Sequence, residues 1–198
     1  SLSSLIFNII YRVKLPNPKI VGTYRVKNEE RFIEKSLQSV MDICSEIVIY
    51  DDNSTDKTVE ICSSFDKVVD IVTQSNTALN EVRDRNFLLG MGLKRKPDFI
   101  LSIDGDEIFM PNAAEILFEE LEVIYSSTNV FEFQFLTCWD SPDEIRFDGI
   151  FGNYWQKRLL RIKNQSLDLK FKNTSNPGNL HCGSIPKNAD GFENSIRS

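Results

Sequence analysis

Apolar and amphipathic segments alternate along the first two thirds of the chain. Between the apolar runs, apolar residues recur three and four positions apart, a spacing that predicts helices; the first such segment is residues 29–41. Asn80 and Asn112 precede two later segments of this kind and are candidate helix caps. Strands that alternate with helices predict an α/β fold with a mostly parallel sheet. The apolar runs that predict buried strands are residues 19–23, 47–50, 68–72, 99–103 and 130–136.

The pattern weakens after the last of these runs. Residues 137–152 are polar and aromatic, residues 154–162 fit a further strand, and residues 164–198 predict a loop with little regular structure. Two prolines separate a leading segment, residues 1–18, from a single domain over residues 19–198. Because no closing element ends the chain, we expect it to stop short of the natural C-terminus.

Composition narrows the class of protein. The chain has 198 residues with 41% hydrophobic and 26% charged residues, which is ordinary for a globular domain. Its net charge of −6 and the absence of a polybasic run argue against a nucleic-acid partner. Four cysteines without a CxxC pair suit reduced thiols in the cytoplasm. No apolar run approaches the roughly 20 residues of a membrane span, although residues 5–10 suit peripheral association with the inner face of a membrane.

A group of acids follows the fourth apolar run. Asp104 and Asp106 are separated by one glycine, and Glu107 adds a third carboxylate. Ionised acids this close repel one another unless a cation lies between them. Hard oxygen ligands suit Mg²⁺ or Mn²⁺, which commonly bind a substrate phosphate as well. The alternative is a solvated turn without a ligand.

Other polar residues follow the earlier strands. Thr23 closes the first apolar run, and Asp51 and Asp52 come directly after the second. In parallel sheets, ligands bind at the carboxyl ends of the strands. We therefore expect these residues and the Asp104 to Asp106 acids to gather on one edge of the sheet.

Three segments together resemble a known family. Residues 24–30, 51–56 and 104–107, each after a predicted strand, match in order and spacing the motifs of the family 2 glycosyltransferases, which have the GT-A fold. The resemblance covers residues 19–110 well and the remainder loosely. It implies a three-layer α/β sandwich with a nucleotide-sugar-binding half, residues 19–110, and an acceptor half, residues 111–198.

The resemblance assigns donor-binding roles. It implies that Thr23 and the loop from Arg25 to Glu30 lie near the base and ribose of the donor. Asp52 is implied to hydrogen-bond the nucleobase, which a carboxylate does by accepting an imide or amino proton. The alternative for Asp52 is an acid that favours a helix start, a role that Asp56 fits better.

Further donor contacts and the metal ligands follow in the same way. Arg83 and Arg85 lie where the family places a nucleotide-contacting arginine, and Arg85 is the closer match; both could instead be solvated charges on a helix. Asp104 is implied to contact the ribose or the metal's water shell, and Asp106 to coordinate the metal. The chain's only histidine, His181, is a candidate metal ligand or donor contact, with a structural role as the alternative.

The acceptor side is less defined. An inverting enzyme needs a general base within reach of the acceptor. The family draws it from the region after the fifth strand, where Asp148 and Asp140 are the first candidates and Asp143 and Glu144 the others. Aromatic neighbours suit Asp148 to a raised pKa. Residues 157–161 match a basic stretch of family members, which could meet an anionic ligand or form a half-exposed strand.

The predicted function is transfer of a sugar from a UDP- or GDP-sugar to a hydroxyl of a glycan, a lipid carrier or a protein, aided by Mn²⁺ or Mg²⁺. Inversion and single-sugar transfer are expected, since the motifs of processive synthases are not clearly present. One alternative is a non-catalytic nucleotide- or glycan-binding module of the same fold. Another is a haloacid-dehalogenase-type phosphatase, although its acids belong on the first strand. The oligomeric state stays open.

Overall fold

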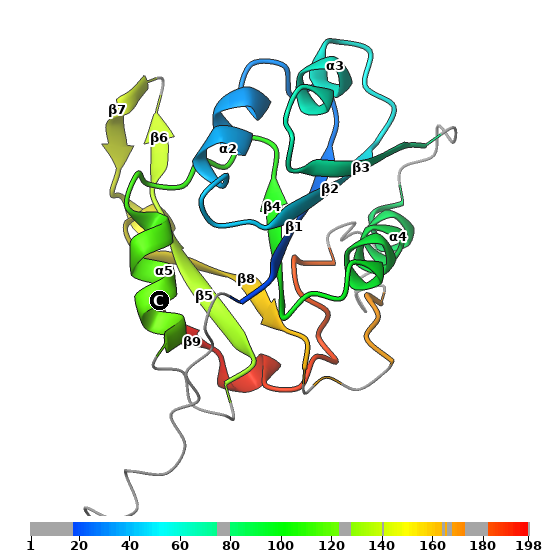
Figure 1. Cartoon of the computed structure of the whole chain (residues 1–198). Helices are drawn as coiled ribbons and strands as arrows, with labels where there is room; N and C mark the ends of the chain where they lie inside the picture. The colour runs from blue at the N-terminus through cyan, green and yellow to red at the C-terminus, as the bar shows by residue number, and fades with distance from the viewer. Residues whose placement is uncertain are drawn as a thin grey trace, which may run out of the picture.

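The computed structural model describes residues 18–74, 80–122, 128–139, 141–163, 165, 168–172 and 182–197. Its main sheet contains β1 (Ile20–Val26), β2 (Glu46–Asp51), β3 (Val68–Thr73), β4 (Phe99–Asp104), β5 (Val130–Phe135), β8 (Tyr154–Arg161) and β9 (Ile196–Arg197). The strand order is β3-β2-β1-β4-β8-β5-β9 (Figure 1). All five strands expected from the apolar runs are therefore confirmed, as is the further strand near residues 154–162.

The sheet is parallel through its first half. β1 pairs in parallel with both β2 and β4, and β2 pairs in parallel with β3. β8 then runs antiparallel between β4 and β5. This insertion places the first residues of β8 beside the carboxyl ends of β4 and β5, which is the edge where the acids were expected.

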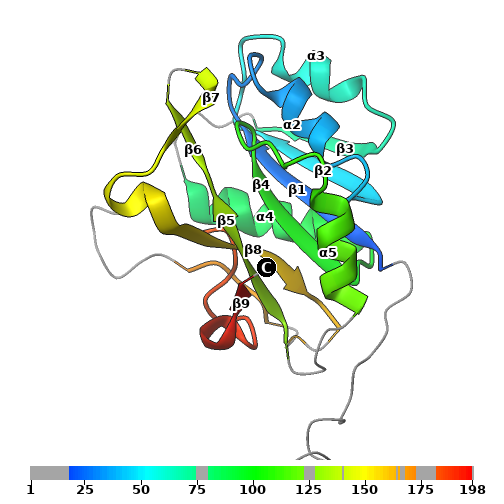
Figure 2. The same ribbon diagram turned by 90° about the vertical axis from the view of Figure 1, so that its left-hand side faces the viewer.

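Helices cover both faces of the sheet. α2 (Ile33–Ser39), α3 (Thr58–Ser63) and α5 (Ala113–Glu122) share one hydrophobic core with the sheet, to which Leu37, Cys62 and Leu117 contribute. α4 (Glu81–Lys94) lies on the opposite face (Figure 2), where Leu88 and Met91 pack against β1 and β2. The three-layer α/β sandwich is thus confirmed.

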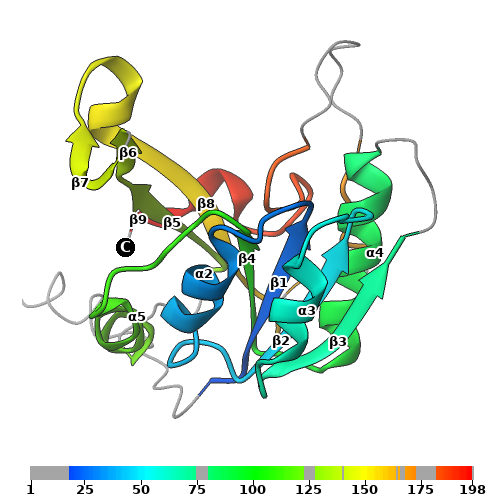
Figure 3. The same ribbon diagram turned by 90° about the horizontal axis from the view of Figure 1, so that it is seen from above.

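The C-terminal part of the chain completes the α4 face. Residues 182–192 contribute Cys182, Ile185 and Ala189 to a core shared with Ile100 and Leu160. The expectation of little regular structure holds for the described part, which contains only β9 and the short helix η3 (Phe192–Asn194). Its burial against the sheet was not expected. β6 (Thr137–Trp139) and β7 (Ser141–Arg146) form a separate hairpin that projects beyond the sheet (Figure 3), and η2 (Gly149–Asn153) follows it.

Element ends differ locally from the prediction. The first helix begins at Ile33 rather than residue 29, and β1 continues to Val26 rather than ending at residue 23. Asn80 caps α4 as expected, since its side chain accepts a hydrogen bond of 2.9 Å from the amide of Arg83. Within the described ranges, no helix is both long enough and apolar enough to cross a membrane.

Candidate functional site

The Asp104 carboxylate lies at the end of β4 between two guanidinium groups. Arg85 of α4 donates to its Oδ1 atom at 3.2 Å, and Arg158 of β8 donates to its Oδ2 atom at 3.1 Å. Burial raises the pKa of Asp104, but the charges of Arg158 and Arg85 outweigh burial and bring the pKa below its ordinary value. Asp104 is therefore ionised at neutral pH, and the protein itself compensates its charge.

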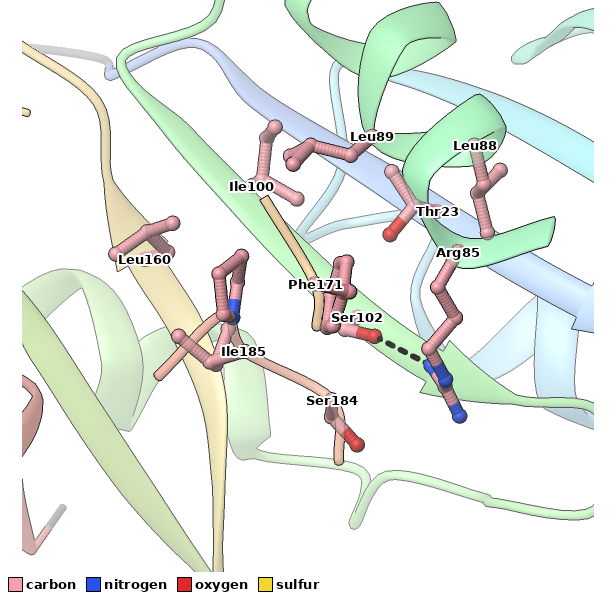
Figure 4. Close-up of a pocket in the computed structure, with 11 residues that line it drawn as sticks. Thr23, Arg85, Leu88, Leu89, Ile100, Ser102, Leu160, Phe171, Ser184 and Ile185 are labelled. Atoms are coloured by element: carbon pink, nitrogen blue, oxygen red, sulfur yellow. Dashed lines mark hydrogen bonds between the residues drawn. The ribbon is translucent and has the colours of Figure 1, made fainter. Parts of the chain in front are cut away.

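Arg85 is part of this site and not a surface residue. Its side chain is buried, its Nε atom donates to Glu81 at 2.8 Å, and its Nη1 atom donates to the hydroxyl of Ser102 at 3.3 Å (Figure 4). The alternative of a solvated helix charge is wrong for Arg85, because α4 packs this face onto the sheet. With three partners, the guanidinium has a fixed orientation toward the end of β4.

Arg158 corrects the expectation of a half-exposed strand over residues 157–161, whereas contact of this stretch with an anionic ligand stays a prediction. The side chain is only 2% exposed and donates to Asp104, Glu107 and Ser184. Burial follows from the position of β8 between β4 and β5, where both faces of a strand are covered. Arg161 is also buried, but it pairs with Phe99 at the opposite end of β4.

The turn after β4 is closely packed. A Cβ atom on Gly105 would lie 2.7 Å from Cγ of Glu29, so a glycine lets the turn rest on that side chain. Glu107 closes the turn by accepting a hydrogen bond of 3.1 Å from the backbone amide of Asp104. Burial raises the pKa of Glu107 to about 7, against the opposing charge of Arg158. Between these fixed residues, Asp106 is exposed to solvent.

The acids fit a divalent cation bound together with a phosphate. Among the described residues, no three His, Cys, Asp or Glu side chains form a metal cage. Mg²⁺ needs no such cage, because it keeps several waters and takes one or two carboxylates plus substrate phosphates. Exposed Asp106 fits direct coordination, whereas Asp104, with a guanidinium at each oxygen, fits a contact through metal-bound water. His181 lies outside the described residues.

A second network lies at the ends of β1 and β2. Arg25 donates to Asp52 at 2.7 Å and to Asp84 at 3.1 Å, which brings two predicted donor residues together. Asp84 of α4 is completely buried and also accepts from Arg83 at 2.8 Å and from the hydroxyl of Tyr50 at 3.1 Å. This network fixes the Arg25 and Asp52 side chains at the edge of the sheet.

The sequence prediction did not include Asp84. A signal was present, because Asp84 stands four and seven positions before the buried residues Leu88 and Met91 and so shares their helix face. An acid on a buried face requires a cationic or hydrogen-bonding partner. Arg25 and Arg83 are the cationic partners of Asp84, so both of these predicted donor contacts belong to the same network.

Thr23 and Glu30, the other two predicted donor residues, lie outside this network. Because β1 continues to Val26, Thr23 is in the middle of the strand, where its hydroxyl donates to the carbonyl of Leu101 at 3.3 Å. Its expected position at the strand end is therefore wrong. Glu30 is exposed and accepts a hydrogen bond of 3.1 Å from the amide of Lys57 at the start of α3. Asp56 serves the same helix start, as expected, by accepting from the amide and hydroxyl of Thr58.

A small cavity lies beneath this edge and not at it. Thr23, Ser102 and Arg85 line it together with apolar residues of the sheet and α4 (Figure 4). Its volume of about 20 Å³ holds a single water molecule. The cavity is therefore too small for a nucleotide.

The acceptor candidates are only partly described. Asp148 is exposed and forms an ion pair with Arg146 at 2.8 Å, and this hydrogen bond lowers the pKa of Asp148. The expectation of a raised pKa is wrong, because the neighbour that matters is a cation and not an aromatic ring. Glu144 is exposed. Asp140 lies outside the described residues, and the side chain of Asp143 is not described.

Comparisons with known proteins give this geometry a family. The model of glycosyl transferase family 2 matches residues 25–165. An uncharacterised glycosyltransferase of Rickettsia bellii is 34% identical over 116 residues, which are 59% of this chain and 36% of that protein. Glycosyltransferase GlyG of Streptococcus pneumoniae is 28% identical over 104 residues, 51% of this chain and 32% of that protein. The chain thus spans about a third of the length of these relatives.

A solved structure supports the fold. The crystal structure of S. aureus TarS 1-349 matches with a TM-score of 0.51 and 18% identity, covering 62% of this chain and 37% of that one. At this identity the likeness concerns the fold alone. The family model, by contrast, extends over most of the chain and includes both networks at the sheet edge. The chain belongs to glycosyl transferase family 2.

Proposed function

We propose that the protein transfers a sugar from a nucleotide-diphosphate donor to a hydroxyl group, with Mg²⁺ or Mn²⁺ bound at Asp106. The observation that carries the proposal is the turn after β4, where exposed Asp106 follows an Asp104 whose two oxygens are held by arginines. A divalent cation at such a site neutralises charge on a leaving diphosphate. Family membership supports the same chemistry.

The donor would lie along the edge from β2 to β4. One oxygen of Asp52 accepts a hydrogen bond from Arg25. Such an acceptor suits a base that presents an imide or amino N–H. The donors that we propose are UDP- and GDP-sugars, as the family resemblance implies, with the diphosphate directed toward Asp106.

The acceptor would approach from the side of β8 and the β6–β7 hairpin. We propose a glycan, a lipid carrier or a protein as the acceptor class, and inverting transfer of a single sugar. Asp140 stays a prediction for the general base. Asp148 also stays a prediction, but its lowered pKa makes it a weaker base than expected.

Calorimetric titration with UDP, GDP and CDP, with and without Mn²⁺, tests the donor site. We expect UDP or GDP to bind, and to bind more tightly with Mn²⁺; CDP shows whether the site also takes a pyrimidine with an amino group. Asp106→Ala should remove the effect of Mn²⁺. The matched control is Asp66→Ala, since Asp66 is an equally exposed acid before β3, at the opposite edge of the sheet. An equal loss in both variants, or no binding of any nucleotide by the unmodified protein, would contradict the proposal.

The same protein separates an enzyme from a binding module. A catalytic site should hydrolyse a bound nucleotide sugar slowly in the absence of acceptor, and hydrolysis should depend on the metal and on Asp106. Binding without any hydrolysis or transfer would favour the non-catalytic module. Release of nucleoside diphosphate over hours, followed by chromatography, gives this readout.

A further inference from the structure

Arg158 occupies an irregular position in β8. The register of β5 against β8 shifts between Phe131 and Glu132: Phe131 lies opposite Leu159, whereas Glu132 lies opposite Lys157. Arg158 therefore has no residue opposite it on β5, which is the geometry of a β-bulge. Bulges redirect a side chain, and they are frequent beside functional sites.

The redirected side chain reaches the turn that carries Asp106. Its Nη2 atom donates to Asp104 and also to Glu107, one residue on either side of the Gly105-Asp106 pair. Its Nη1 atom donates to Ser184, and its guanidinium carbon lies 5.0 Å from the ring centroid of Phe135. The guanidinium of Arg158 thus contacts both ends of the turn, while Ser184 and Phe135 hold it in place.

Charge explains why this contact matters. The Nη2 atom of Arg158 donates to both carboxylates, so one cation faces the acids at both ends of the turn. A guanidinium has several nitrogen donors in a fixed plane, so Nη2 donates to both acids while Nη1 donates to Ser184, whereas a lysine ammonium has a single nitrogen. The bridge therefore keeps both acids in place in the absence of any ligand.

We propose that Arg158 is a positioning residue, which fixes the turn of residues 104–107 so that Asp106 is held ready for the metal and the donor diphosphate. This inference rests on the proposed function. Arg158 itself is buried and acts through Asp104 and Glu107. A site whose ligands are held in advance binds more tightly, because less conformational entropy is lost on binding.

The test compares Arg158→Gln with Arg161→Gln. Both variants remove a buried arginine from β8, but Arg161 lies beside the start of β4, five residues or about 17 Å from Asp104. The first readout is hydrogen exchange of the backbone amides of residues 105–107. We expect exchange at least about tenfold faster in Arg158→Gln and unchanged in Arg161→Gln when both are measured well below their unfolding temperatures.

The second readout is the affinity for UDP, or for GDP if the unmodified protein prefers it, with and without Mn²⁺. Arg158→Gln should weaken binding about tenfold with Mn²⁺ and less than threefold without it. Arg158→Lys should fall between, since lysine keeps the positive charge but has no second nitrogen to donate to Ser184. Arg161→Gln should lower thermal stability and leave the Mn²⁺-dependent affinity unchanged.

Several outcomes would overturn the inference. One is a folded Arg158→Gln with exchange and affinity within twofold of the unmodified protein, and another is an equal loss in Arg161→Gln. If Arg158→Gln does not fold, Glu107→Gln removes one side of the bridge and should also speed exchange of the turn; unchanged exchange there would overturn it. If the unmodified protein binds no nucleotide, the proposed function fails, and hydrogen exchange alone decides whether Arg158 positions the turn.

Discussion

Replacing Asp84 by Asn tests the buried network behind the predicted nucleobase site. The carboxylate is 0% exposed and accepts hydrogen bonds from Arg25, Arg83 and Tyr50. Asn has nearly the same shape, so the substitution opens no cavity. It removes the charge and presents an amide N–H₂ group to partners that are all donors.

The expected cost follows from the exposure of the partners. Removing one member of a buried ion pair costs about 3–5 kcal/mol, because the other charge stays buried without compensation. Arg83 is 35% exposed and can regain water, and Arg25 keeps its contact with Asp52, so we expect the lower end, about 3 kcal/mol. For a chain of this size, that loss lowers the unfolding temperature by roughly 6–12 °C.

Urea and thermal unfolding of Asp84→Asn measure this cost directly. Asp70→Asn is the control, since Asp70 is an exposed acid on β3 and should change stability by less than about 0.5 kcal/mol. Nucleotide affinity should also fall in Asp84→Asn, because Arg25 then keeps only Asp52 of its two carboxylate partners and is held less firmly. A loss of stability under about 1 kcal/mol, which is typical of surface pairs, would refute the assignment of Asp84 as the centre of a buried network.

Three further predictions concern other parts of the fold. Gly22→Ala should destabilise the protein by about 1–3 kcal/mol in urea, because the new Cβ would lie 2.9 Å from Sγ of Cys44; Cys44→Ala in the same chain should recover part of the loss. The Glu132 pKa is lowered to about 2, first by the hydrogen bond from Ser195, so its stabilising effect is present above its ordinary pKa of 4.5 and is lost as pH falls toward 2. The difference in unfolding free energy between the unmodified protein and Glu132→Gln should therefore shrink between pH 5 and pH 2.5, and a constant difference would contradict this assignment. A thiol reagent at pH 8 should label exposed Cys138 in the folded protein and spare Cys44, whose pKa burial raises to about 12. Mass spectrometry of the labelled peptides measures the order, and faster labelling of Cys44 would contradict this prediction.

The sequence predicted the strands and the edge they share because both follow from local patterns. Apolar runs mark strands buried on two faces, and parallel strands end on one edge, so Asp52 and Asp104 could be placed together without a structure. The end of β1 was harder to predict. Arg25 is accommodated within the strand by its ion pairs with Asp52 and Asp84, and no run of apolar residues marks that extension.

Arg158 could not be placed from the sequence for a different reason. Its role depends on β8 entering the sheet antiparallel between β4 and β5, and on the bulge opposite Phe131 and Glu132. Both are pairings between distant segments, which leave no periodic signal in the strand itself. The basic stretch therefore suggested either a half-exposed strand or a ligand contact, while its first arginine, Arg158, is buried against the acids of the turn.

The arrangement of charges also gives a physical reason for the metal dependence that we propose. A protein of net charge −6 must supply positive charge locally to hold a diphosphate. Among the described residues, four arginines lie at this edge, and Arg25, Arg83, Arg85 and Arg158 all have carboxylate partners within the protein. Asp52, Asp84 and Asp104 neutralise most of the charge of these arginines, so little positive charge remains to attract a phosphate. A divalent cation at Asp106 would supply the missing charge, which is why we expect nucleotide binding to depend more on the metal than on any one arginine.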